Sequence, residues 1–138
     1  MKSLLVSVAV AIAAVTFTPV AHAQMLLGNY EVITPRDPVH VWVWQVSCDS
    51  QCLHVNAIPR PGGGAVPWDA SAQLVDGRYT MAVDVFAGLI CPGYAVTTHD
   101  TYSWDAVTLE GSVDSSYAQG CWGAPGGTDT YPFRLSRY

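Results

Sequence analysis

Lysine is almost absent from this sequence, and charge of either sign is scarce. The only lysine is Lys2, and charged residues make up 12% of the 138 residues, about half the usual share of a soluble domain. Without Lys2 the chain has five arginines against eleven acidic residues, a net charge of −6. Nucleic acid and anionic membrane surfaces need clustered cations, so the composition argues against both as partners.

Helical patterning is missing beyond the first 23 residues. No apolar stripe with a 3.6-residue period runs past two turns there, and no apolar run approaches the ~20 residues that span a bilayer. Within residues 1–23, Lys2 precedes a short apolar run over residues 4–15, and Ala21-His22-Ala23 matches a cleavage signal. We therefore expect a cleaved signal peptide over 1–23 and a secreted or envelope-located domain over 24–138, with no transmembrane segment in the mature chain.

Catalytic and metal-binding motifs are also missing. The chain has no G-x-S-x-G elbow, and its one run of three glycines lacks the Lys and Ser/Thr of a phosphate-binding loop. Asp100 and Asp105 fall on opposite faces of an expected strand, which does not suit a pair of catalytic carboxylates. Cys48, Cys52 and His54 supply only three of the four ligands of a structural zinc site. We expect no enzyme activity, no metal and no cofactor.

Two-residue alternation of apolar and polar side chains is abundant. Such stretches lie at residues 26–33, 39–48, 52–58, 71–75, 78–91, 94–104, 107–113 and 131–136. About eight short strands predict a single all-β antiparallel meander, either a barrel or a sandwich. A barrel would form if the first and last strands paired and removed the open edges. The glycine- and proline-rich residues 59–67 and 120–130 are expected to be loops, and Asp84 is expected to face solvent.

The four cysteines, in an exported chain, predict two disulfides. They are Cys48, Cys52, Cys91 and Cys121. Of three possible pairings we favour Cys48–Cys52 with Cys91–Cys121. A three-residue turn would set Cys48 opposite Cys52 on adjacent strands, and the same register would set His54 opposite Val46 on the cysteines' face. A loop-entropy model gives about 2 kcal/mol for the small ring and about 3.5 kcal/mol for the larger one.

The five tryptophans divide into two groups by their positions in the expected strands. Trp42, Trp44 and Trp104 share the parity of apolar neighbours and are expected in the core. Trp68 and Trp122 are expected at loop edges. There they could stack on a sugar ring or cover an apolar ligand, or they could cap the open ends of the core. Trp68 and Trp122 are therefore the candidate ligand-binding residues.

Several short motifs follow one another along the chain. They are Gly28-x-Tyr30, Trp44-x-x-Ser47-Cys48-x-x-x-Cys52, Cys91-x-Gly93, Leu109-x-Gly111, a late Cys121 and Phe133-x-Leu135. With the signal peptide, this order resembles a group of small uncharacterised secreted proteins from mycobacteria and related actinobacteria. The resemblance covers nearly all of residues 24–138. It implies an exported β-domain and brings no catalytic residues with it.

These features favour a secreted, non-enzymatic β-domain that acts as an interaction or ligand-binding module in the cell envelope or outside the cell. Its partner would be a protein, a glycan or an apolar small molecule. One alternative is an envelope hydrolase with a dispersed active site, which would gather titratable groups with shifted pKa values in a cleft. Another is a carrier of a lipid or small apolar ligand, which needs a lumen cavity of ~300 Å³ or more. Inward-facing tryptophans could fill that space.

Overall fold

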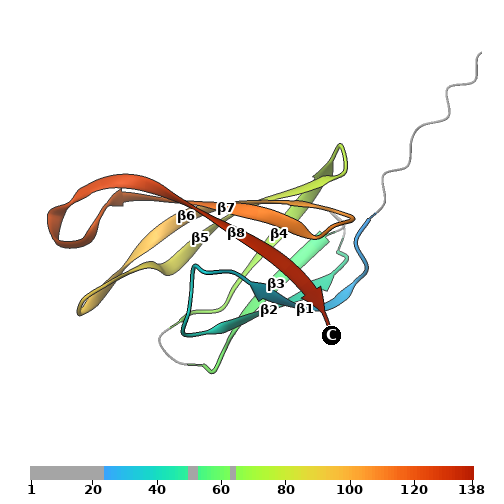
Figure 1. Cartoon of the computed structure of the whole chain (residues 1–138), viewed down its shortest axis with the longest axis horizontal. Coiled ribbons are helices and arrows are strands. Elements are labelled where there is room, and N and C mark those ends of the chain that lie inside the picture. The colour runs from blue at the N-terminus through green and yellow to red at the C-terminus, as the bar shows by residue number, and fades with distance from the viewer. Residues whose placement is uncertain (1–23, 50–52, 63–64) are drawn as a thin grey trace, which may run out of the picture.

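The alternating pattern produces eight antiparallel strands in the computed structural model, which describes residues 24–49, 53–62 and 65–138. The strands are β1 (Gly28–Ile33), β2 (Val41–Ser47), β3 (Leu53–Arg60), β4 (Trp68–Val75), β5 (Arg78–Cys91), β6 (Tyr94–Asp105), β7 (Glu110–Gln119) and β8 (Pro125–Arg137). Each strand pairs with its neighbours in sequence, and β1 pairs with β8, which closes the sheet into a barrel (Figure 1). The predicted all-β meander is confirmed, and of the two architectures left open the barrel is the one that forms.

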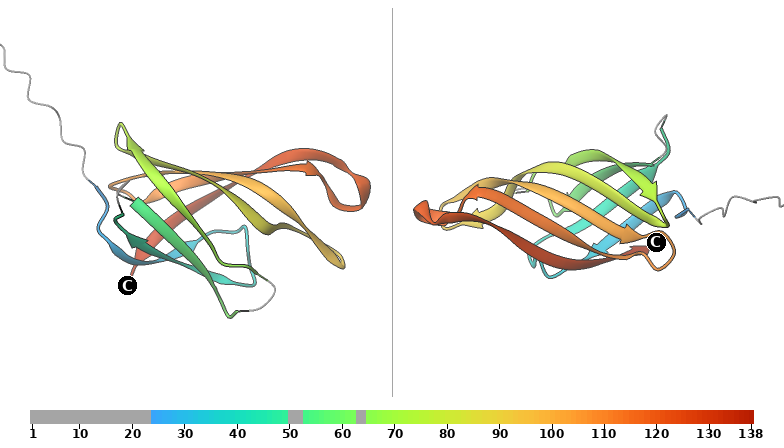
Figure 2. Two further views of the ribbon diagram at one scale, coloured as in Figure 1. Left: turned by 180° about the vertical axis from the view of Figure 1, so that it is seen from behind. Right: turned by 90° about the horizontal axis from the view of Figure 1, so that it is seen from above.

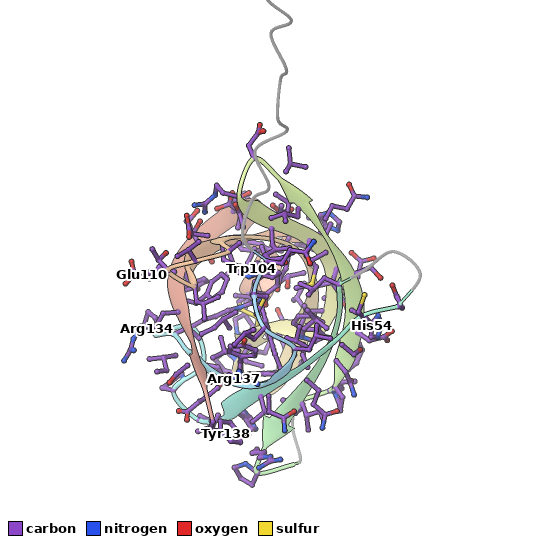
Figure 3. All side chains as sticks on the ribbon, turned by 90° about the vertical axis from the view of Figure 1, so that its right-hand side faces the viewer. His54, Trp104, Glu110, Arg134, Arg137 and Tyr138 are labelled. Carbon is purple, nitrogen blue, oxygen red and sulfur yellow. A yellow bond between two sulfur atoms is a disulfide. The ribbon has the colours of Figure 1, made fainter. Side chains whose placement is uncertain are left out.

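Closure gives every strand one face toward the lumen and one toward solvent. Along β6, Asp100 and Trp104 are buried, whereas Asp105 lies on the opposite face, as their spacing predicts. On β5, Asp84 is exposed, also as predicted. Figure 3 shows Trp104 inside the ring of strands and Glu110 outside it. The strand period therefore sorts side chains between the lumen and the surface.

The strand connections fall alternately at two ends of the barrel. The end that we call the packed end carries the β4–β5 and β6–β7 turns, together with residues 24–27 and Tyr138 (Figure 1). The end that we call the open end carries the 34–40 loop, the β5–β6 turn and the short 3-10 helix η1 (Cys121–Gly123). At the open end the β5–β6 and β7–β8 hairpins extend beyond the β1–β2 connection (Figure 2).

Aromatic rings fill the half of the lumen near the packed end. Trp44 lies with its ring centroid 5.3 Å from that of Trp104 and 5.6 Å from that of Phe133, in edge-to-face or tilted contacts. Met25 closes this end, because its backbone N–H donates to the Tyr79 hydroxyl (3.3 Å) and its sulfur accepts from the Trp104 indole N–H (3.4 Å). The expected core positions of Trp44 and Trp104 are confirmed, and such well-packed rings contribute most of a small domain's stability.

The β2–β3 hairpin has a different register from the predicted one. Val46 pairs with Val55, so His54 pairs with Ser47 and points outward (Figure 3). Leu53 and Val55 are buried, and this requirement to fill the lumen sets the register. If the observed register continued, Cys48 would lie opposite Leu53 and not opposite Cys52. The predicted alignment is therefore wrong by one residue. Cys52 lies outside the described residues, so the Cys48–Cys52 disulfide stays a prediction.

Part of one expected loop is a strand. Residues 125–130 belong to β8, which pairs with β7 from Pro125 onward. A Cβ atom at Gly126 would lie 2.4 Å from the Ala118 carbonyl oxygen. This glycine permits close contact between two strands, whereas the sequence pattern had been interpreted as a turn signal. The expected loop at 59–67 is also shorter, because β3 continues to Arg60.

One disulfide links the two long hairpins at the open end. Cys91, the last residue of β5, is bonded to Cys121 in η1, with a Cα–Cα distance of 5.5 Å. The predicted Cys91–Cys121 pairing is confirmed. The described parts of the chain contain no helix with the length and apolar character needed to cross a membrane.

Candidate ligand-binding cavity

The half of the lumen near the open end holds a cavity of about 600 Å³. Apolar and aromatic side chains from strands all around the barrel form most of its wall, among them Trp42, Trp68, Val85, Val113, Tyr131 and Phe133. Sites for small molecules commonly have volumes of about 300–1,000 Å³. An eight-stranded barrel can hold one small ligand where side chains do not fill its interior. The inward tryptophans therefore fill only one half of this lumen.

A bulge in β5 shapes one wall of the cavity. The β5–β6 pairing shifts register between Val85 and Leu89, and Ala87 has a left-handed backbone conformation (φ 62°). A Cβ atom at Gly88 would lie 1.9 Å from the Thr98 hydroxyl oxygen, so only glycine fits there. The bulge leaves residues 86–88 without partners in the regular ladder and brings them to the cavity wall.

Trp68 and Trp122, the two candidate ligand-binding residues, lie in different places. Trp68 is the first residue of β4 and directly follows the connection from β3. Its ring lies 5.5 Å from that of Tyr102 and 5.9 Å from that of Trp44, and it lines the cavity. Trp122 lies in η1, is 72% exposed, and contacts only Tyr94 edge-on at 5.2 Å among the described aromatic rings. The structure therefore brings only Trp68 to the cavity.

A polar cluster crosses the open half of the lumen. Arg36 enters from the 34–40 loop and forms an ion pair with Asp100 on β6, whose side chain is 0% exposed. The guanidinium also donates to Tyr102 Oη (3.0 Å), Ser115 Oγ (3.1 Å) and Thr98 Oγ1 (3.4 Å). Thr98 in turn donates to Asp100 Oδ1 (2.8 Å). The cluster ties the 34–40 loop to β6 and β7 with every enclosed polar atom hydrogen-bonded.

Burial and charge act in opposite directions on Arg36. Burial alone would lower the pKa of the guanidinium, but its contacts with Tyr102 and Asp100 outweigh burial and raise that pKa. Burial raises the pKa of the Tyr102 hydroxyl well above its usual range. Arg36 is therefore charged and Tyr102 is a neutral phenol. A buried pair of this kind fixes the position of a loop more than it adds net stability.

Asp37 borders the cavity beside Arg36. One carboxylate oxygen accepts from the Trp42 indole N–H (3.0 Å) and lies 3.0 Å from His40 Nδ1, while the other accepts from the backbone N–H groups of Val39 (3.0 Å) and His40 (3.1 Å). Burial alone would raise the pKa of this carboxyl group, but these hydrogen bonds outweigh burial and lower it. The carboxylate is therefore ionised at neutral pH and holds Trp42 and His40 in position.

The sequence interpretation missed Arg36 and Asp37, which line the cavity, and Asp100, the buried partner of Arg36. One signal was available, because Asp100 has the same parity as Trp104, which was expected in the core. A buried carboxylate requires a buried donor or cation. The sequence does not identify that partner, because Arg36 lies 64 residues away in a loop.

His54, which had been considered as a metal ligand, lies outside the barrel. Its ring nitrogens are 3.7 Å from Asp49 and 3.5 Å from Asp69 on the outer surface. In the described ranges no three His, Cys, Asp or Glu side chains gather in a way that could hold a metal ion. The cavity is therefore the best-formed site in the described part of the chain.

The cavity combines aromatic walls, one internal ion pair and one fully hydrogen-bonded carboxylate. This arrangement can enclose a small molecule and exclude water from it. Comparison of the chain with protein-family models, with curated proteins and with solved structures finds no match.

Proposed function

We propose that this protein is a secreted, non-enzymatic β-barrel that binds a small apolar molecule in the open half of its lumen. The observation that carries the proposal is the cavity of about 600 Å³ with aromatic walls, in a barrel whose other half is packed. A ligand that buries ~200 Å² of apolar surface there would gain ~5 kcal/mol before the entropic cost of binding. A carrier of an apolar ligand, one of the alternatives from the sequence, fits this geometry better than a surface module for proteins or glycans.

Export through the predicted signal peptide is part of the proposal. Met25 is built into the packed end, where it contacts Tyr79 and Trp104. Cleavage after Ala23 would keep Met25 in the mature chain, so the predicted cleavage site is compatible with the fold. N-terminal sequencing of protein from the culture medium should read from Gln24. Protein found only inside cells, with residues 1–23 attached, would contradict the export part of the proposal.

A neutral fluorescent probe, N-phenyl-1-naphthylamine, tests the binding part directly. We expect saturable binding of about one probe per protein, with increased probe fluorescence. Trp68→Ala should weaken the affinity about tenfold, because Trp68 forms part of the cavity wall. Trp122→Ala is the matched control and should bind the probe like the parent protein. Absence of saturable binding by the folded protein, or equal losses in the two variants, would contradict the proposal.

One observation favours a second candidate, the envelope hydrolase. Asp37 and His40 form a carboxylate–imidazole pair at the cavity, with the closest N–O distance at 3.0 Å. Such pairs orient an imidazole base in many hydrolases. A hydrolase should cleave p-nitrophenyl butyrate with saturation kinetics, and His40→Ala should abolish that activity. Hydrolysis no faster than that by free imidazole at the same concentration would exclude this substrate class and favour the binding protein.

A further inference from the structure

We propose that the molecule bound in the cavity is uncharged and carries a hydrogen-bond acceptor such as a ketone or ester oxygen. This ligand class rests on the proposed binding function and makes it more specific. It follows from a difference between the polar groups that border the cavity. Arg36 and Asp37 already have partners within the protein, whereas two neutral donors have none among the described residues.

Among the described residues, Arg36 is the one Arg or Lys that lines the cavity, and it already has a counter-ion. Arg36 pairs with Asp100, and its two terminal nitrogens also donate to Tyr102, Ser115 and Thr98. A ligand anion that took over Arg36 would leave the fully buried Asp100 carboxylate without its counter-ion. Stranding a buried charge is strongly unfavourable. The cavity therefore disfavours carboxylates, including fatty-acid headgroups.

The Asp37 carboxylate also has its hydrogen-bond partners within the protein. It receives two backbone N–H groups and the Trp42 indole N–H, and the His40 ring lies within hydrogen-bond distance of it. A carboxylate has about four lone-pair sites, so little acceptor capacity is left for a ligand ammonium group. Among the described residues, neither Arg36 nor Asp37 is thus available as an ionic partner for a ligand.

Two neutral groups on the cavity wall do have unused donors. In the described residues, neither the Trp68 indole N–H nor the Tyr131 hydroxyl makes a protein hydrogen bond, and both residues line the cavity. Every enclosed side-chain nitrogen or oxygen in the same residues has a partner, so these two groups must face accessible space. An indole N–H can only donate. A ligand without an acceptor would remove water from these groups and leave them unsatisfied.

A matched set of four naphthalene probes tests this ligand class on the mature protein. The set is naphthalene, 2-acetylnaphthalene, 2-naphthoate and 2-naphthylmethylammonium, titrated by calorimetry at pH 7. We expect 2-acetylnaphthalene to bind most tightly and naphthalene to bind about three- to tenfold more weakly, the value of one or two hydrogen bonds. Both ions should bind at least about tenfold more weakly than 2-acetylnaphthalene, because neither finds an available counter-ion.

Two conservative variants test whether the proposed donors cause the preference for 2-acetylnaphthalene over naphthalene. Trp68→Phe and Tyr131→Phe keep an aromatic ring and remove the donor, so each should reduce 2-acetylnaphthalene affinity about threefold and leave naphthalene affinity unchanged. Trp122→Phe, outside the cavity, should change neither. Tighter binding of 2-naphthoate than of 2-acetylnaphthalene, or an unchanged ketone preference in both donor variants, would overturn the inference while leaving the binding function intact. If none of the four probes binds the folded protein, the proposed function itself fails.

Discussion

The two halves of the lumen are built from the same strands and yet have opposite contents. On β6, Trp104 packs among rings near the packed end, whereas Asp100, four residues earlier, holds Arg36 in the open half. The packed half contains well-packed aromatic contacts, and the open half contains a cavity of about 600 Å³ and a polar cluster. Under the proposed function, folding stability and ligand binding are separated along the barrel axis.

Tryptophan truncation should affect the two halves unequally. Trp104→Ala removes a fully buried ring and should lower the free energy of unfolding by about 3–5 kcal/mol. Trp68→Ala removes a half-buried ring that already borders a cavity, so its cost should be less than half as large. Urea denaturation of both variants measures the difference. Equal losses would show that the cavity wall contributes to stability as much as the core does.

Replacing both charged residues of the polar cluster should lower the free energy of unfolding less than replacing only one of them. Asp100→Ala strands the Arg36 charge in the lumen and should cost about 3–5 kcal/mol. The double variant Arg36→Met with Asp100→Leu removes both charges and should recover most of that loss. Thermal and urea denaturation of the single and double variants measure this coupling. A double variant as unstable as Asp100→Ala would show that the pair itself supplies net stability.

Loss of the disulfide should destabilise the open end. Cys121→Ser opens a bridge that spans 30 residues and should cost about 3.5 kcal/mol by the loop-entropy model. Cys48→Ser, which would break the smaller predicted ring, should cost about 2 kcal/mol. Guanidinium denaturation under non-reducing conditions compares the two variants. Equal midpoints would contradict this ranking of the bridges.

Low pH should destabilise the 34–40 loop, because it protonates the Asp37 carboxylate. The pKa of Asp37 is lower in the folded state than in the unfolded state. The stabilisation from the ionised carboxylate is therefore fully present above the unfolded pKa of about 3.9 and is lost as pH falls through the folded pKa. The Asp37 side chain is 25% exposed, so solvent still screens it, and the effect should be the smallest of the four. The difference in melting temperature between the parent and Asp37→Asn should shrink below about pH 4. A constant difference between pH 6 and pH 2 would contradict the role given to this carboxylate.

Local patterns predicted the barrel's elements better than its cavity. Alternation placed most of the strands, put Trp44 and Trp104 inside, and allowed β1 to pair with β8. The hairpin register at His54 was wrong, because it was taken from an assumed turn length, whereas Val55 and its buried neighbours set it. Gly126 was read as a turn residue because a sequence does not reveal how closely the neighbouring strand approaches.

The cavity itself depends on contacts between distant residues. Arg36 meets Asp100 only when the barrel closes, across 64 residues of sequence. Gly88, a glycine in the interior of β5, can mark a bulge, but the sequence interpretation did not use this signal. Trp68 was expected at a loop edge, and its position in the sequence did not reveal that its ring would contact Tyr102 and Trp44 inside the barrel. Local periodicity therefore determines the strands, and long-range closure determines which part of the lumen stays empty.

Filling the cavity tests the separation of the two halves most directly. Val113 is buried on β7 and borders the cavity, so Val113→Phe places a larger side chain in the empty space. The measurement is the affinity for N-phenyl-1-naphthylamine, with the melting temperature as the check on folding. We predict a protein that melts no lower than the parent and binds the probe at least about tenfold more weakly, because the added ring fills the cavity without disturbing the packed half. A folded Val113→Phe protein that binds the probe as tightly as the parent would contradict the assignment of the binding site to this cavity.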